Sequence, residues 1–147
     1  MTTPPRPLAQ RVQDTRRRLD EDVDAWVATA DGAGTPYLVP LSFLLDGETL
    51  LISTAAGNPT ARNIRAGGQV RLTIGQTRDV VLIEGSAVVA EKITDDVADA
   101  FAAKTGFDPR DQRDYPYFRI RPHLIQAWRE VDEIVGRDLM VDGKWLT

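Results

Sequence analysis

The fold class is decided by residues 34–70, GTPYLVPLSFLLDGETLLISTAAGNPTARNIRAGGQV, which predict two strands followed by a short helix. Residues 36–45 are mostly apolar, and residues 48–54 form a second apolar run. Asp46-Gly47 lies between the two runs and is typical of a tight hairpin turn, because glycine adopts positive φ without steric cost. Beyond Gly57 the apolar spacing lengthens to that of a helix.

The start of this helix is a candidate anion site. Asn58 can cap the helix, and Pro59 suits the first helical position, where its missing N–H costs nothing. The unpaired amides and the helix dipole favour a phosphate or carboxylate, and Arg62 adds a charged donor fork. Pro40 and Ser42, in an otherwise apolar strand, favour a strand that is interrupted to face a ligand. The alternatives are an ordinary loop-to-helix junction and a simple edge-strand proline.

The rest of the chain predicts four more strands and two more helices. The strands are expected at residues 24–30, 69–74, 80–91 and 120–131, and the helices at residues 6–24 and 94–104. Gly85 lies within the 80–91 strand and predicts a bulge there. Most connections between strands are too short to hold a crossover helix. We therefore expect a mainly β fold, an antiparallel barrel of about six strands with peripheral helices, in a single domain over residues 1–147.

Composition excludes several classes of protein. No apolar run approaches the roughly 20 residues of a membrane helix, and the N-terminal MTTPPRPLAQ lacks the apolar core of a secretory signal. We therefore expect a cytoplasmic protein without a membrane partner. The net charge of −4 gives no reason to expect nucleic-acid binding. Zero cysteines and a single histidine, His123, leave no thiolate or multi-histidine metal site.

The common catalytic motifs are also missing from the sequence. It contains no GxSxG, GxxxxGK[ST], GxGxxG or HExxH, and we assign no catalytic residue. The carboxylates of Glu130, Asp132 and Glu133 are close together, and we expect them to form a solvated face rather than an acid–base pair.

Segments spread over nearly the whole chain resemble the pyridoxamine-phosphate-oxidase-like split β-barrel proteins, which bind flavin or a deazaflavin coenzyme. No segment is diagnostic alone, but their order and spacing together carry the resemblance. The segments are Ala28-Thr29, Gly34-Thr35-Pro36, residues 39–43 (VPLSF), Asp46-Gly47, residues 51–54 (LIST), residues 60–64 (TARNI), residues 69–72 (QVRL), Glu84-Gly85, residues 120–122 (IRP) and Ala127-Trp128.

The resemblance implies a split barrel that forms a homodimer, with a cofactor cleft at each of two related subunit interfaces. It implies that the cofactor ring lies against one strand and that the phosphate is bound near the helix start. The implied ring residues are Leu38, Val39, Pro40, Leu41 and Ser42, and the implied phosphate contacts are Ser53, Thr54, Thr60 and Arg62. Asn63 is a further implied cofactor-binding residue.

The chemistry that the resemblance implies is hydride transfer between the ring and a small organic substrate. The protein then needs to bind the cofactor, orient its ring and exclude water, so no catalytic triad is required. Our leading hypothesis is a reductase that uses the deazaflavin coenzyme F-420. FMN as the cofactor, a non-catalytic cofactor carrier and a barrel without cofactor remain as alternatives. Vitamin B6 oxidation is not expected, because the fuller basic and substrate-binding signatures of true pyridoxamine phosphate oxidases are missing.

Overall fold

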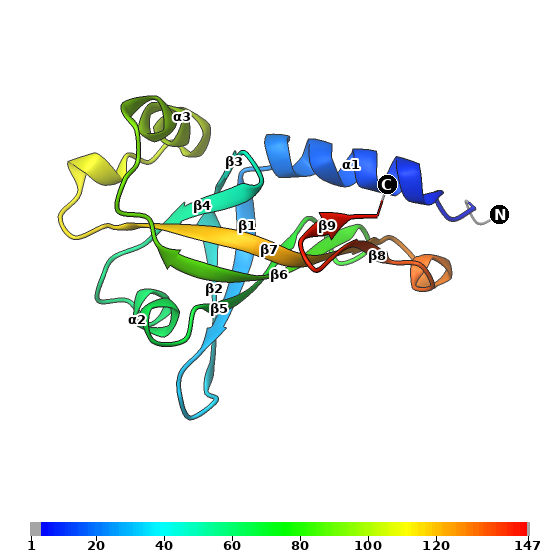
Figure 1. Ribbon diagram of the computed structural model, residues 1–147, viewed down its shortest axis with the longest axis horizontal. Helices are drawn as coiled ribbons and strands as arrows, with labels where there is room; N and C mark the ends of the chain where they lie inside the picture. The colour runs from blue at the N-terminus through cyan, green and yellow to red at the C-terminus, as the bar shows by residue number, and fades with distance from the viewer. Residues whose placement is uncertain (1–3, 147) are drawn as a thin grey trace.

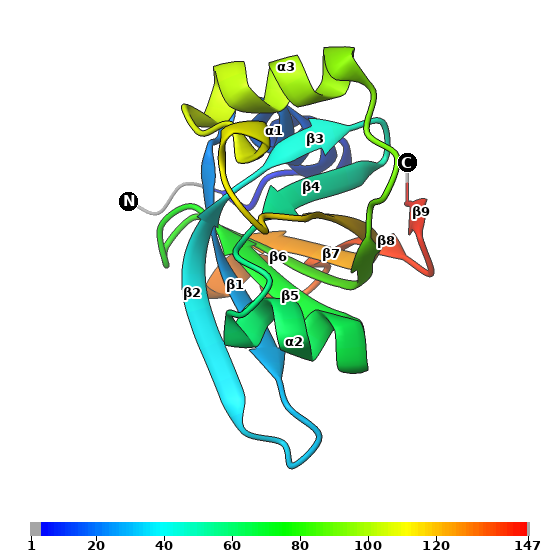
Figure 2. The ribbon, with the colours of Figure 1, turned by 90° about the vertical axis from the view of Figure 1, so that its left-hand side faces the viewer.

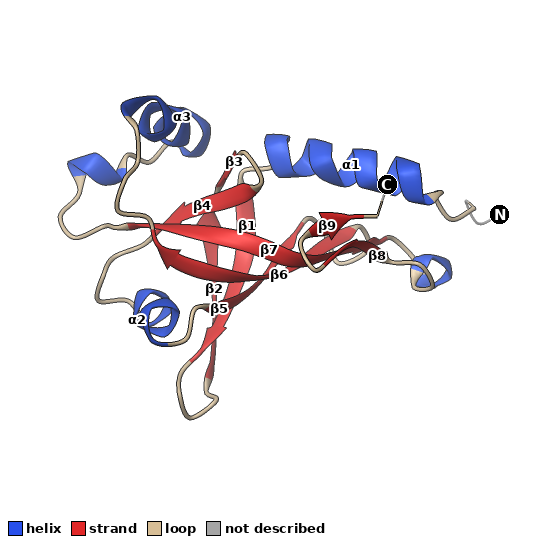
Figure 3. Ribbon diagram, in the orientation of Figure 1, coloured by secondary structure: helices blue, strands red, loops and turns tan. Residues whose placement is uncertain are grey.

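A computed structural model describes residues 4–146, and its elements are shown in Figures 1 and 3. The helices are α1 (Leu8–Glu21), α2 (Pro59–Ala66) and α3 (Asp95–Thr105), with short 3-10 turns at Pro109–Asp111 and Val131–Glu133. The strands are β1 (Asp24–Ala30), β2 (Pro36–Ser42), β3 (Leu44–Asp46), β4 (Thr49–Ser53), β5 (Gln69–Ile74), β6 (Val80–Val89), β7 (Tyr117–Trp128), β8 (Asp138–Val141) and β9 (Lys144–Trp145).

The strands form one curled antiparallel sheet. Its order is β2-β1-β5-β6-β7-β4-β3, with β8 paired to β7 and β9 paired to β8. In Figures 1 and 2, α1 and α3 lie beyond β3 and β4, and α2 lies on the opposite side of the molecule, near β2 and β5. The expected fold class, a mainly β antiparallel split barrel with peripheral helices, is confirmed.

The predicted strand over residues 36–45 is in fact two strands, β2 and β3, which lie at opposite ends of the sheet order. The chain changes partner at Phe43, which is fully buried and whose backbone N–H donates to the Val23 carbonyl at 2.9 Å. The strand is interrupted at this buried residue. Before it β2 pairs with β1, and after it β3 pairs with β4.

Other strand boundaries also differ from the prediction. β7 begins at Tyr117 and ends at Trp128, three residues earlier at each end than expected. Strands β8 and β9 were not expected from the sequence, so the estimate of about six strands is too low. None of the helices in the described part of the chain has the length and hydropathy of a membrane span.

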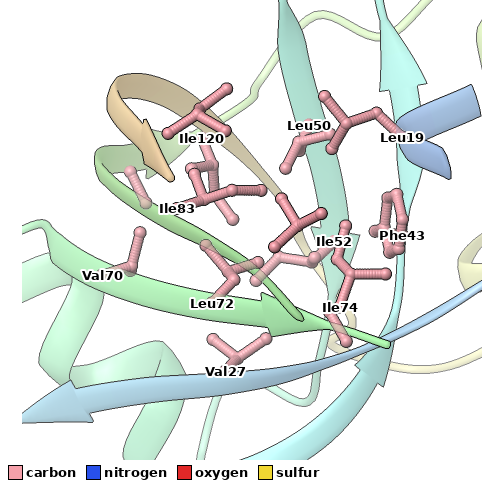
Figure 4. Close-up of a cluster of buried hydrophobic side chains, with 14 of the residues drawn as sticks. Leu19, Val27, Phe43, Leu50, Ile52, Val70, Leu72, Ile74, Ile83 and Ile120 are labelled. Atoms are coloured by element: carbon pink, nitrogen blue, oxygen red, sulfur yellow. The ribbon is translucent and has the colours of Figure 1, made fainter. Parts of the chain in front are cut away.

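The hydrophobic core lies on the concave side of the sheet. Figure 4 shows side chains from β1, β4, β5, β6 and β7 gathered with Phe43 and with Leu19 of α1. Along β1 burial alternates, so that Ala25, Val27 and Thr29 are buried while Trp26 is 51% exposed on the outer face. The alternation leaves an outer sheet face with a large aromatic side chain that nothing in the described chain covers.

Two local predictions from single residues are confirmed. The pairing of β6 with β7 shifts register between Glu84 and Gly85, as expected for a bulge. A Cβ atom at Gly85 would lie 2.6 Å from the Arg121 carbonyl oxygen, so the close approach requires glycine. Thr94 caps α3, because its Oγ1 accepts from the Val97 N–H at 3.3 Å.

The expectation that Glu133 lies on a solvated face is wrong. Its side chain is 3% exposed, and its carboxylate accepts hydrogen bonds from the Arg6 guanidinium at 2.8 and 3.0 Å. The Arg6 side chain is 10% exposed, and its guanidinium also donates to Asp14 at 3.2 Å. This contact ties the segment before α1 to the loop after β7, whereas Glu130 and Asp132 are exposed as expected.

Candidate functional site

A cleft of about 310 Å³ lies where the end of β2, the end of β4 and α3 come together. It brings together five of the predicted cofactor residues, and α3 with the segment after it supplies the opposite wall. The predicted residues in the cleft are Pro40, Leu41, Ser42, Ser53 and Thr54, and the opposite wall consists of Phe101, Thr105, Phe107 and Tyr115.

The β2 side of the cleft is the edge of the sheet. Within the described residues β2 pairs with β1 alone, and Pro40 lies opposite Trp26. The interpretation of Pro40 as an edge-strand proline is therefore confirmed, since an edge tolerates a missing donor. Leu38 is 60% exposed on the same outer face, and neither Leu38 nor Val39 lines the cleft. At the end of β2, the Ser42 hydroxyl donates to the Asp24 carboxylate at 2.7 Å.

The β4 side of the cleft is held by two hydroxyl groups. Ser53 Oγ is 2.9 Å from the Pro116 carbonyl oxygen, to which it donates. Thr54 Oγ1 accepts from the Asn58 side-chain amide at 2.9 Å, which leaves the Thr54 hydroxyl hydrogen to donate elsewhere. The bond from Ser53 to Pro116 joins the end of β4 to the segment before β7, and the Ala56 N–H adds a second bond to this segment, to the Asp114 carbonyl at 2.8 Å. The bond between Thr54 and Asn58 lies within the loop before α2.

The predicted side-chain cap of α2 is wrong, although Pro59 does begin the helix. Asn58 has the extended backbone of an N-cap residue, but its amide donates to Thr54 instead of accepting from the first turn. Pro59 has no N–H and the Arg62 N–H donates to the Asn58 carbonyl at 3.1 Å, so within the described chain the Thr60 and Ala61 amides are the two of the first turn that could serve an anion site.

The other predicted residues of α2 lie on two different faces of the helix. Thr60 is buried at 1% exposure, and the Asn63 side chain donates to Thr29 Oγ1 at 3.0 Å. Arg62 is exposed, and its guanidinium donates to the Gly57 carbonyl at 2.9 Å. None of the three lines the cleft itself, because the apolar face of α2 turns Thr60 inward with Ala61 and Ile64. Arg62 is thus a surface charge close to the loop that follows Thr54.

Aromatic rings dominate the wall opposite β2. Phe107 and Tyr115 have ring centroids 5.3 Å apart, and Phe101 packs edge-on against Tyr117 at 5.5 Å. The Tyr117 hydroxyl is buried without a hydrogen-bond partner in the described chain, and burial raises the pKa of this phenol. From the sequence, Tyr115 and Tyr117 are candidate ring or substrate contacts of unassigned orientation, whereas Phe101 and Phe107 were not expected in the wall, because α3 is far from β2 and β4 along the chain.

No residue that lines the cleft in the described part of the chain carries a charge. The nearby cations are engaged elsewhere. Lys104 Nζ lies 4.2 Å from the centre of the Phe43 ring, and burial lowers the pKa of this amine. Arg110 bonds Asp99 at 2.9 Å and Asp108 at 2.8 Å. Within the described residues, no group of three or more acidic or histidine side chains is arranged to hold a metal ion.

A second, larger cavity of about 670 Å³ lies over β1, β5 and β6, beside the end of α2. Its polar lining includes His123 and the ion pair between Arg71 and Glu84, whose atoms are 2.5 Å apart. It contains none of the predicted cofactor residues.

Comparison with known proteins supports the fold described above and identifies the family of the chain. The sequence pattern of the pyridoxamine 5'-phosphate oxidase family matches residues 13–129. No curated protein sequence matches the chain. A Listeria innocua protein provisionally named a pyridoxamine 5'-phosphate oxidase superposes with a TM-score of 0.67 at 19% identity, over 81% of this chain and 98% of that one.

Two further solved structures are similar at the level of the fold. A protein named F-420 reductase has a TM-score of 0.59 at 21% identity, over 75% of this chain and 94% of that one. A heme-binding protein from Mycobacterium smegmatis has a TM-score of 0.66 at 18% identity, over 94% of this chain and 59% of that one. Since the family pattern spans most of the sequence and the curled sheet agrees with it, the chain belongs to the pyridoxamine 5'-phosphate oxidase family of split β-barrel proteins.

Proposed function

We propose that this chain is an oxidoreductase that binds the deazaflavin coenzyme F-420 and acts on a small organic substrate. The observation that carries the proposal is the position of an uncharged cleft beside a helix start that retains free first-turn amides and an exposed arginine. An uncharged wall suits a planar ring, and a helix start with an arginine suits a phosphate. When bound, the coenzyme supplies the hydride chemistry, and the protein supplies binding and orientation.

The residues present divide the work between the ring and the phosphate. Pro40, Leu41 and Ser42 offer a sheet edge for one face of the ring. Thr54 keeps a hydroxyl hydrogen to donate, and Arg62 uses one of its donors on Gly57 and keeps others for an anion. Leu38 and Val39, which do not line the cleft, and Thr60 and Asn63, which point into the protein, contribute less directly than the resemblance implies.

We also propose that the protein is a homodimer formed through the outer face of the sheet. Trp26 on β1 and Leu38 on β2 are more than half exposed there, on neighbouring strands, and Val88 on β6 is exposed as well. Exposed apolar side chains grouped on one face mark interaction surfaces more often than scattered ones do. Pro40 lies on the same face as Leu38, so a partner on this face would stand beside the cleft.

The experiment that tests the phosphate assignment is a titration of Arg62→Ala with the coenzyme. Loss of a charge-assisted hydrogen bond is expected to cost about 1.5–3 kcal/mol, or about 10- to 150-fold in affinity. Arg78→Ala is the matched control, because Arg78 is an exposed arginine that pairs with Glu130 at 3.1 Å. Equal affinities for the two variants would contradict the assignment, and a melting curve for each excludes loss of fold as the cause.

FMN is the alternative cofactor, and a non-catalytic carrier is the alternative function. Both use the same cleft and the same Arg62 contact, so the choice between cofactors is made by direct comparison of affinities. Tight coenzyme binding without turnover of enones, quinones or tetrapyrroles would favour the carrier.

Heme binding is a second candidate function, and one observation favours it. His123, the single histidine in the sequence, lines the larger cavity, and an imidazole is a common ligand of heme iron. A hemin titration of the wild type and of His123→Ala, followed by the Soret band, tests it. A band that is the same in both proteins would remove this candidate.

A further inference from the structure

We infer that Asn58 is a positioning residue for the coenzyme, because its side-chain amide turns the Thr54 hydroxyl so that the hydroxyl hydrogen is donated into the cleft. The inference rests on the proposed function, since it assigns a role in the same site. It is drawn from the hydrogen bonds of the loop between β4 and α2, from the burial of Thr54 and from the polar groups that line the cleft.

The Thr54 hydroxyl has one partner and keeps one hydrogen. Thr54 lines the cleft and is 5% exposed. Its Oγ1 accepts from Asn58 Nδ2 at 2.9 Å, and an amide nitrogen can only donate. The hydroxyl hydrogen must therefore point away from Asn58, and within residues 4–146 it has no acceptor. A buried donor without an acceptor is costly, so an oxygen or nitrogen acceptor of a ligand is favoured at this point of the cleft.

The other serine and threonine hydroxyls that line the cleft are used inside the protein. Ser42 donates to a carboxylate at 2.7 Å, and Ser53 and Thr105 donate to backbone carbonyls at 2.9 and 2.7 Å. Among the serine and threonine residues of the described lining, Thr54 is therefore the one that offers a hydrogen to a ligand. The direction of this hydroxyl decides whether the sheet side of the cleft presents a donor.

The backbone of Asn58 is held in place without its side chain. Its N–H donates to the Ala55 carbonyl at 3.0 Å, and its carbonyl accepts from the Arg62 N–H at 3.1 Å. Pro59 follows, and a residue before proline is restricted to extended backbone, which Asn58 has at φ −72° and ψ 150°. Substitution of Asn58 should therefore leave the loop in place and change only the group that faces Thr54.

The change Asn58→Asp reverses the polarity of the contact with Thr54. An amide nitrogen donates to the hydroxyl, whereas a carboxylate only accepts, so the hydroxyl must turn and donate to the carboxylate. The hydrogen is then lost to the cleft, although the two side chains stay in contact. A contact that only holds the loop would survive this change, whereas a contact that orients the hydroxyl would lose its effect.

The test is a double-mutant cycle of Asn58→Asp and Thr54→Val, in which the affinities for F-420 and FMN are measured by ring fluorescence. In the wild-type background, Thr54→Val removes the donor and should weaken binding about 2- to 12-fold. In the Asn58→Asp background the donor is already turned away, so Thr54→Val should leave the affinity unchanged. Repulsion between the new carboxylate and the coenzyme phosphate is present in both Asn58→Asp proteins and cancels in the cycle.

Two results of the cycle would overturn the inference. One is an equal loss from Thr54→Val in both backgrounds, which is expected if the contact only holds the loop, and the other is no loss in the wild-type background. Thr54→Ser keeps the hydroxyl and should restore the affinity that Thr54→Val loses. Thr35→Val is the control for removal of a hydroxyl, because Thr35 is exposed between β1 and β2 and does not line the cleft. Melting curves of the variants exclude loss of fold as the cause.

A measurement on the coenzyme-free protein separates failure of this inference from failure of the proposed function. In Asn58→Asp, a hydrogen bond from Thr54 should lower the pKa of the new carboxyl, and Thr54→Val should raise that pKa again, as followed by NMR between about pH 2 and 7. A pKa that does not respond to Thr54→Val would overturn the inference even if the coenzyme binds. If the pKa responds and the wild type binds neither F-420 nor FMN, the proposed function fails, while Asn58 stands as the residue that sets the direction of the Thr54 hydroxyl.

Discussion

Replacement of Glu133 by glutamine tests how strongly the loop after β7 is tied to the N-terminal segment. The Glu133 carboxylate accepts from the backbone N–H of Arg6 at 2.9 Å, from the Arg6 guanidinium at 2.8 and 3.0 Å, and from the Arg129 N–H at 2.8 Å. These bonds, above all those from the Arg6 side chain, lower the pKa of Glu133 from 4.5 to about 2. Glutamine keeps the shape of the side chain but removes the charge.

The pKa shift gives the size of the effect and its pH dependence. A shift from 4.5 to about 2 corresponds to a contribution of about 3 kcal/mol when the carboxylate is ionised. Because the pKa is lowered in the folded state, the contribution is complete above about pH 5 and disappears as the pH falls from 4.5 towards 2. Since glutamine retains one acceptor oxygen, we expect Glu133→Gln to lose about 2 kcal/mol at pH 7, or about 4–8 °C in Tm.

Urea unfolding of wild type and Glu133→Gln between pH 2.5 and 7 measures this difference. Glu130→Gln is the control, because Glu130 is exposed and pairs with the exposed Arg78, and such a surface pair contributes about 0–1 kcal/mol. Two results would refute the reasoning. One is a loss in Glu133→Gln no larger than in the control, and the other is a loss that stays constant down to pH 2.5.

Three further changes have expected outcomes. Gly85→Ala places a Cβ 2.6 Å from the Arg121 carbonyl oxygen and should lower the free energy of unfolding by about 1–3 kcal/mol; an unchanged Tm would show that the bulge relaxes. Thr94→Ala removes the cap bond to Val97 and should cost about 1 kcal/mol in urea unfolding, whereas Thr94→Asp should not. Leu38→Asp should convert the proposed dimer to a monomer in light scattering, and an unchanged mass would exclude the outer face as the interface.

The sequence predicted best those elements that are determined by a local pattern of residues rather than by contacts with distant segments. The strands over residues 24–30 and 69–74 have the predicted bounds, because strict alternation is sufficient to define a strand that is buried on one face. Gly85 and Thr94 act where expected, since a bulge and a helix cap depend on few neighbours. Five of the ten predicted cofactor residues meet in one cleft, and all five come from the end of β2 or from the end of β4 and the residue after it, whereas the predicted residues of α2 do not line it.

The features that the sequence did not reveal depend on contacts between distant segments. The strand break at Phe43 carries no turn residue, and it results from the exchange of β1 for β4 as the pairing partner. Glu133 is buried because Arg6, at the other end of the chain, supplies its hydrogen bonds. The aromatic wall brings α3 and the segment after it to the same cleft as the end of β2, and no spacing in the sequence indicates that proximity.

The central claim, that the cleft and the start of α2 bind a deazaflavin coenzyme, is tested most directly by paired titrations of the purified coenzyme-free protein. Coenzyme F-420 and FMN are titrated at the same salt concentration, and binding is followed by the change in ring fluorescence. We predict saturable binding of both rings, with the higher affinity for F-420. A higher affinity for FMN would contradict the choice of coenzyme, and binding of neither would contradict the assignment of the cleft as a cofactor site.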